Sequence, residues 1–337
     1  MPKASSPKID QIWTAIQGIQ AGVPLKEVAR AAQVTVPTIK KWRAKYGEVS
    51  SRESLDIILN PEDNRYVSVM RKLFKDKYVR GDVGFDWERS ELDRIAAGLG
   101  INKVLNLGDN IYAIRHGRDD LPREIRSMAP PNKEWLLLPN GKSAYRFVLV
   151  DRAFLDPDTS KEPIKIPDST PQIVSRNAKQ DEQAVLARIR YCRLVDIFMG
   201  LASFQLQSHM RTTITHFNGA QTELDEIYVG VDANGTQFVI PIQAKSLGER
   251  IGAIQIITDH YVCREKFPAM VTRTLAATIV RRETLADFGE VLTIALVEGR
   301  VGENYNVTKI REEHFKLVPS AAITEDDLAL YRQRFTR

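Results

Sequence analysis

The stretch ELDEIYVGVDANGTQFVIPIQAK, residues 223–245, predicts a β-hairpin. Two runs of alternating apolar residues flank Ala233-Asn-Gly235, a three-residue loop in which Gly235 can take the left-handed position of a bulged turn. If Asn234 is the centre of the loop, the numbers of two paired residues add up to twice 234. The pairs that this register predicts are Val231 with Gln237, Asp225 with Gln243, and Glu223 with Lys245.

Side chains alternate along a strand, so this register places four polar residues on one face of the hairpin and Glu226 and Ala244 on the other. The four residues are Glu223, Asp225, Gln243 and Lys245. Two carboxylates beside the backbone carbonyl of Ala244 are the hard oxygen ligands that Mg²⁺ prefers. A neighbouring lysine can orient a water molecule and stabilise charge on a phosphoryl group. The cluster therefore predicts metal-assisted phosphodiester hydrolysis.

A structural interpretation of the same four residues is a salt bridge between Glu223 and Lys245 and a hydrogen bond between Asp225 and Gln243. Cross-strand pairs of this kind are common and contribute about 0.2–1 kcal/mol each. Lys245 argues for the catalytic interpretation, because it follows an apolar strand in which a buried ammonium group is costly.

The arrangement resembles the restriction-endonuclease-like superfamily, the PD-(D/E)xK nucleases. On this resemblance Asp225 takes the first acidic position and Gln243-Ala-Lys245 the tripeptide, with glutamine in place of the usual acid. The resemblance covers about residues 130–320. It implies an α/β nuclease domain with a mixed sheet, Mg²⁺ as cofactor and double-stranded DNA as substrate.

The resemblance also implies two further site residues outside the hairpin. The missing carboxylate is supplied by Glu223 or by Glu182, which lies where many such nucleases carry a glutamate on a helix. An acid in the first turn of a helix also simply complements the helix dipole. Gln255, on the helix after the catalytic strand, would support the site from behind, and an ordinary polar helix residue is the alternative.

The N-terminal residues 8–46 show the apolar spacing of three short helices. Residues 25–42, LKEVARAAQVTVPTIKKW, resemble a DNA-binding helix-turn-helix. In that arrangement the third helix faces the major groove or its phosphates with Thr35, Thr38, Lys40, Lys41 and Arg43. The alternative is a helical adaptor whose basic face is only solvated.

A second unit is predicted over residues 53–128. It contains helices at 64–77 and 85–98, followed by a turn and an alternating strand at 106–115. This order resembles a winged helix, with Arg115 and Arg118 near the phosphates. A purely structural domain is the alternative. The predicted domains are thus 1–48 (helix-turn-helix), 53–128 (winged-helix-like) and 130–337 (nuclease), the last with a hairpin at 135–150 and a long helix at about 179–203.

Composition sets few further limits. The chain has 337 residues, enough for two or three domains, and its 48 Lys and Arg against 43 Asp and Glu leave a net charge of +5, which permits nucleic-acid binding without requiring it. No apolar run approaches the length of a membrane span. Two cysteines cannot form a disulfide framework, so we expect a cytoplasmic protein without a membrane partner.

The sequence therefore predicts a Mg²⁺-dependent, site-specific DNA endonuclease of the type II restriction kind, expected as a homodimer because two-fold DNA symmetry is commonly matched by the protein. A modification-dependent or repair endonuclease is the alternative within the nucleases. Outside the enzymes, the alternative is a helix-turn-helix transcription regulator whose C-terminal domain is a sensor or dimerisation module.

Overall fold

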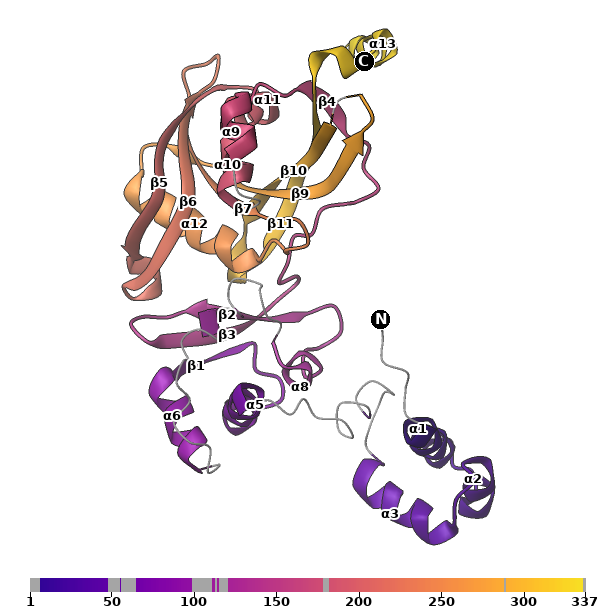
Figure 1. Cartoon of the computed structure of the whole chain (residues 1–337). Coiled ribbons are helices and arrows are strands. Elements are labelled where there is room, and N and C mark those ends of the chain that lie inside the picture. Colours follow the sequence, from indigo (N-terminus) through magenta and orange to yellow (C-terminus); the bar gives the residue numbers. More distant parts are fainter. Residues whose placement is uncertain are drawn as a thin grey trace. The chain divides into compact units, whose positions relative to one another are not determined.

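The computed structural model describes residues 7–47, 55, 65–98, 111–112, 114, 121–177, 182–287 and 289–335. These residues form a mixed α/β structure, in keeping with the expected fold class (Figure 1). They fall into two units, one made of residues 1–77, 95–104 and 121–129 and the other of the remaining residues. Within the described ranges no helix is long and apolar enough to cross a membrane.

The first unit is helical. Helices α1 (Pro7–Gln20), α2 (Leu25–Ala31) and α3 (Val36–Tyr46) are present where residues 8–46 predicted three helices. Their core contains two buried clusters, in which Val28, Ala29 and Ile39 pack in one and Ile12 and Ile16 in the other. The same unit contains α5 (Arg65–Lys77) and α8 (Arg123–Arg126), and Arg71 of α5 donates to Glu124 of α8 at 2.5 Å.

A small antiparallel sheet in the second unit has the order β1-β3-β2, with β1 (Gly84–Glu88), β2 (Glu134–Pro139) and β3 (Ala144–Val150). The hairpin predicted at 135–150 is confirmed by the pairing of β2 with β3. The helix predicted over 85–98 is only partly right, because 84–88 form β1 and α6 spans Arg89–Gly98. The strand predicted at 106–115 is wrong at 111, 112 and 114, which are helical, and its other residues lie outside the described ranges.

The larger sheet of the second unit has the order β4-β11-β10-β9-β7-β6-β5, and the short β8 pairs with β7. It is mixed, since β7 runs parallel to β9 and β4 parallel to β11, and it is curled (Figure 1). The bounds of its strands are β4 (Ile164–Pro167), β5 (Ala202–Ile214), β6 (Ala220–Val231), β7 (Gln237–Lys245), β8 (Val271–Thr272), β9 (Thr274–Leu285), β10 (Gly289–Val301) and β11 (Val307–Val318).

Helices cover both faces of the central strand β7. Ile240, Ile242 and Ala244 belong to the core cluster that contains α10 and α11, and Val239 belongs to the cluster that contains α12. The helices of this unit are α9 (Gln172–Asn177), α10 (Glu182–Tyr191), α11 (Leu194–Met199), α12 (Ala253–Lys266) and α13 (Glu325–Phe335), with 3₁₀ turns at Thr215–Phe217, Glu303–Tyr305 and Ser320–Ala322. Because β7 is covered on both sides, it is apolar on both faces until its end.

The single long helix predicted at about 179–203 is wrong. Helices α10 and α11 are separate, because Arg193 between them has a left-handed backbone with φ of 54°. Gly200, with φ of 70°, ends α11, and β5 begins at Ala202. Apolar spacing continued through both helices, so the periodicity alone did not show the break.

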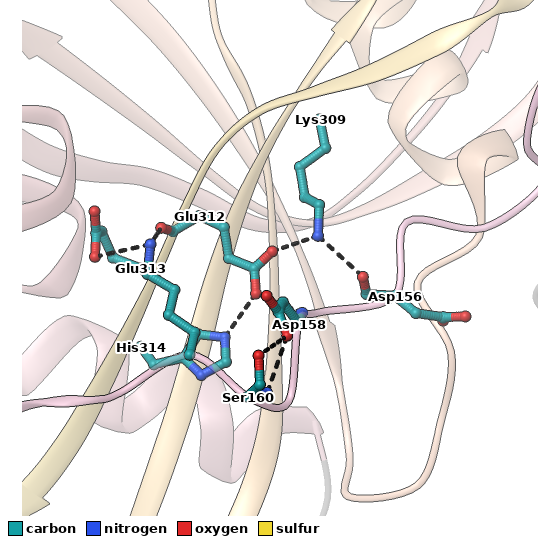
Figure 2. A network of polar contacts seen from close by, with 8 residues as sticks. Asp156, Asp158, Ser160, Lys309, Glu312, Glu313 and His314 are labelled. Atoms are coloured by element: carbon teal, nitrogen blue, oxygen red, sulfur yellow. Dashed lines mark hydrogen bonds and ion pairs between the residues drawn. The ribbon is translucent and has the colours of Figure 1, made fainter.

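A polar network fastens the loop after β3 to β11 (Figure 2). Glu312 accepts hydrogen bonds from the backbone N–H of Asp158 and from His314, both at 2.7 Å, and also from Lys309. Asp158 accepts from the hydroxyl of Ser160 at 2.6 Å. The carboxylates of this cluster are therefore used within the protein, which favours a structural role.

Helix α12 approaches the sheet closely at Gly299 of β10. A Cβ atom at Gly299 would lie 2.9 Å from Cγ2 of Ile256 and 3.1 Å from Cγ1 of Val307. Only glycine leaves room for this contact, which brings α12 close to β10 at Ile256.

We expect Gly299→Ala to lower the free energy of unfolding by about 1–3 kcal/mol, the usual cost of overpacking a core. Urea unfolding followed by circular dichroism measures the change. Gly98→Ala is the control, because a Cβ atom there meets nothing within 4 Å. An equal effect of the two substitutions would contradict the close packing of α12 at Gly299.

Candidate active site

The hairpin of β6 and β7 has the predicted register over most of its length. Six pairs form the ladder, from Val231 with Gln237 to Glu226 with Ile242. The turn is also as predicted: Asp232 accepts the backbone N–H groups of Asn234 and Thr236, and Gly235 has φ of 80°. The sequence therefore predicted the hairpin and its register correctly up to Glu226.

Beyond Glu226 the ladder stops, so the predicted strand pairs of Asp225 with Gln243 and of Glu223 with Lys245 do not form. The neighbouring strand β5 is irregular at the same level. His209 has φ of 51° and forms no pair with Asp225, and the β5–β6 register also shifts between Gln205 and Gln207. A left-handed residue in a strand turns the chain, and the β6–β7 ladder ends beside it.

Asp225 takes the place of the missing strand partner of Ala244. Its Oδ2 accepts the backbone N–H of Ala244 at 3.0 Å. On its other edge β7 still pairs with β9, from Ile242 with Leu275 to Lys245 with Thr278. The N–H and C=O of one strand residue point to the same edge, so the carbonyl of Ala244 also points toward the side of Asp225.

Burial raises the pKa of Asp225 above its usual value, and the nearby charge of Glu182 adds to the increase. The Ala244 N–H, Lys245 and His209 oppose it by stabilising the ionised form. Lys245 is only 5 % exposed, and its charge acts on the carboxyl groups of Asp225 and Asp259, but it forms no salt bridge among the residues that the structure describes. A buried ammonium group without an ion pair is costly, which makes Lys245 the least explained residue of a purely structural site.

A cavity of about 960 Å³ brings the predicted residues together. Its walls contain Glu182, Glu223, Asp225, Gln243, Lys245 and Gln255. The rest of its lining is largely polar and includes His209, Arg211, Thr212, Thr213, Gln221 and Thr222 of β5 and β6, residues that the sequence analysis did not select. The sequence alone does not show that these residues line one cavity, because their positions depend on the pairing of β5 with β6.

Glu223 lies on this cavity with both oxygens in contact with side chains of β5. His209 Nδ1 lies 3.2 Å from Oε1 and Arg211 Nε lies 2.9 Å from Oε2. The predicted salt bridge with Lys245 is thus replaced by contacts with β5. Glu223 is 36 % exposed and Arg211 82 %, so these contacts are solvent-screened and weak.

Gln243 is 2 % exposed, and both atoms of its amide group are used inside the protein. Its Nε2 donates to Asp259 Oδ2 at 3.0 Å, and its Oε1 accepts from Gln255 Nε2 at 2.9 Å. Neither atom contacts Asp225, so the side chain links β7 to α12. Gln255 contacts Gln243, and its supporting role in the site stays a prediction.

Asp259 was missed in the sequence. It is fully buried on α12, and this burial raises the pKa of its carboxyl group well above the usual value, against the opposing hydrogen bond from Gln243. The available signal was an acid four residues after Gln255, on the same side of a helix whose residues 253, 254, 256 and 257 are apolar.

The oxygen donors suit a magnesium ion. The carboxylate of Asp225 accepts the N–H of Ala244, whose carbonyl points to the same strand edge, and Glu182 lines the cavity that Asp225 also lines. Mg²⁺ is usually held by one or two carboxylates while water and substrate phosphate supply its other ligands. Among the residues that the structure describes there is no group of three or more His, Cys, Asp or Glu that could hold a metal ion. Asp225, Ala244 and Glu182 therefore fit only an ion that takes its other ligands from water and substrate phosphate.

The residues selected for DNA contact lie on or next to α3. Lys40, Lys41 and Arg43 are exposed on this helix. Thr35 immediately precedes α3, and its hydroxyl group is 2.9 Å from that of Thr38. Arg115 and Arg118 lie outside the described residues.

Comparisons with family models, with curated proteins and with solved structures found no match for the chain. The resemblance to the PD-(D/E)xK nucleases therefore stays a prediction that depends on Asp225, Gln243 and Lys245 in their strand context. Their joint placement on one cavity is the geometry from which a function can be proposed.

The raised pKa of Asp259 predicts how the free energy of unfolding depends on pH. The group favours its protonated form in the folded chain, so its contribution is complete below the unfolded pKa of about 3.9 and is lost as the pH rises through the raised folded value. Asp259→Asn lacks this titration. We expect its free energy of unfolding, relative to wild type, to increase as the pH rises above about 4.

Urea unfolding across this pH range measures the difference. Asp326→Asn, which changes an exposed aspartate at the start of α13, is the control and should show no such trend. A difference between Asp259→Asn and wild type that stays constant or decreases with pH would contradict the buried, proton-retaining carboxyl group.

Proposed function

We propose that the chain is a Mg²⁺-dependent endonuclease that hydrolyses phosphodiester bonds of double-stranded DNA. The observation that carries the proposal is the buried, unpaired Lys245 on the same cavity as Asp225, at the point where β6 separates from β7. Its charge acts on Asp225 and Asp259, but none of the described carboxylates forms a salt bridge with it. An anionic substrate that enters the cavity would form an ion pair with Lys245.

In the proposed reaction Asp225 and the carbonyl of Ala244 would hold the metal ion, with Glu182 or Glu223 as a further carboxylate. When bound, Mg²⁺ supplies positive charge to the scissile phosphate and its leaving oxygen. Lys245 donates hydrogen bonds to a phosphate oxygen and to the attacking water, which places the water in line with the bond that breaks. Asp225 also keeps the strand end in position through the Ala244 N–H.

The N-terminal helices would supply DNA affinity. Exposed Lys40, Lys41 and Arg43 on α3 suit contacts with phosphates, and Thr35 and Thr38 suit contacts with phosphates or base edges. Cleavage of both strands of a symmetric site would require two copies of the chain. Cleavage of modified or damaged DNA alone would favour the repair or modification-dependent alternative, and binding without any cleavage would favour the regulator.

We expect Asp225→Asn and Lys245→Met each to reduce Mg²⁺-dependent cleavage of plasmid DNA by about 10²–10⁴-fold, the range for groups that act on the reacting atoms. DNA binding in Ca²⁺ should change little. Lys266→Met, which removes an exposed lysine at the end of α12, is the control. If wild type leaves a broad panel of methylated and unmethylated DNA intact, the endonuclease proposal is falsified.

A separate measurement tests the DNA-binding role of α3. The triple substitution of Lys40, Lys41 and Arg43 by alanine should weaken binding of duplex DNA and reduce the slope of log affinity against log salt by up to about 3. Fluorescence anisotropy at several salt concentrations gives this slope. Lys26→Ala on α2 is the matched control, and an unchanged slope in the triple variant would contradict phosphate contacts by α3.

A further inference from the structure

Behind the cavity a chain of buried polar side chains connects β7 to α12. Asp259 is 0 %, Gln243 2 % and Gln255 6 % exposed. Hydrogen bonds of 3.0 and 2.9 Å join the three residues in the order Asp259, Gln243, Gln255. Asp259 does not line the cavity, whereas the two glutamines do. The aspartate therefore reaches the cavity only through Gln243.

This arrangement is costly for a helix that is otherwise packed by apolar residues. Oδ1 of Asp259 and Oε1 of Gln255 are buried, and neither has a hydrogen-bond partner among the described residues. Apolar side chains at these positions would avoid both unmet acceptors, since buried polar groups are expensive unless paired. Stability alone therefore does not explain why Asp259, Gln243 and Gln255 are polar.

The reason that the geometry offers is the position of the end of β7. Three contacts hold this end: the β9 ladder on one edge, the carboxylate of Asp225 on the N–H of Ala244 at the other, and Asp259 on the side chain of Gln243 from the α12 face. Ala244 and Lys245 follow directly after Gln243. A shift of Gln243 would displace the carbonyl and the ammonium group that the proposed reaction uses.

We infer that Asp259 is a positioning residue of the proposed nuclease site, acting through Gln243 to fix the carbonyl of Ala244 and the side chain of Lys245. The inference rests on the proposed function. It also explains the glutamine of the Gln243-Ala-Lys245 tripeptide: a second carboxyl group at position 243 would lie about one hydrogen-bond length from Asp259, and two buried carboxylates so close cannot both be ionised. The amide of Gln243 avoids this conflict, because it donates to Asp259 and carries no charge.

The acid and the amide should therefore be exchangeable between the two positions. Gln243→Glu alone places two carboxyl groups in buried contact, and we expect it to lower Tm by about 5 °C or more at pH 8. In Gln243→Glu/Asp259→Asn the new carboxylate accepts the amides of Asn at 259 and of Gln255, so Tm should return to within about 2 °C of wild type. Thermal unfolding followed by circular dichroism measures all four proteins of this cycle.

Additive changes in Tm would overturn the coupling between Gln243 and Asp259. Gln237→Glu combined with Asp326→Asn, both at exposed positions, is the matched control cycle and should be additive. This part of the test is independent of cleavage.

Positioning is separated from a merely structural role by the kinetics of Asp259→Ala. At a temperature at which circular dichroism shows the variant folded, kcat for DNA cleavage should fall by at least about tenfold while KM stays within about threefold, because displaced groups lose catalysis before binding. Ca²⁺ affinity by calorimetry should fall with kcat, and Asp259→Asn should recover both.

An unchanged kcat in folded Asp259→Ala, or an increase in KM without a decrease in kcat, would overturn the positioning role. If Asp259→Ala does not fold, the double variant decides: restored Tm with kcat and Ca²⁺ affinity still reduced by about tenfold or more would also overturn it. If the Tm values of the cycle are coupled but wild type never cleaves DNA, the proposed function and the catalytic part of the inference are refuted. The coupling between Gln243 and Asp259 would still hold.

Discussion

The separation of β6 from β7 at Asp225 is the feature on which the site depends. A strand edge needs an acceptor for each backbone N–H, and here the carboxylate of Asp225 accepts that of Ala244 at 3.0 Å in place of a carbonyl. The ladder can end without leaving this donor unpaired. The ladder ends at Glu226, and Gln243 and Lys245 at the end of β7 line a cavity. The same contact places a carboxylate next to a backbone carbonyl.

The two helices that cover β7 complete the site from opposite faces. Glu182 begins α10, whereas Gln255 and Asp259 belong to α12. Helix α12 approaches the sheet closely at Gly299. Burial raises the pKa of both carboxyl groups, and more strongly that of Asp259. Asp225 lies at the cavity with opposing cations nearby, whereas Asp259 is fully enclosed and favours its proton. One carboxyl group can thus meet a metal ion while the other serves as a neutral hydrogen-bond partner.

Much of the central hairpin could be predicted from its sequence, because the turn residues Asp232 to Thr236 determine which residues pair and alternation determines the faces. The last pairs could not be predicted, since the ladder ends where a third strand, β5, is irregular at the left-handed His209. Asp259 was missed because helix–sheet packing brings it to Gln243. Strand β1 was taken for helix because its partner β3 lies about sixty residues along the chain. Local patterns predicted local structure, and long-range pairing decided the remainder.

The most direct test of the proposed metal site is a crystal structure of the protein grown with Mn²⁺, with anomalous diffraction measured for that ion. The account predicts an anomalous peak within coordination distance of the carboxylate of Asp225 and the carbonyl of Ala244, with Lys245 on the same cavity. The peak should be absent from crystals of Asp225→Asn grown in the same way. A peak elsewhere, or no peak at a Mn²⁺ concentration that supports DNA cleavage in solution, would contradict it.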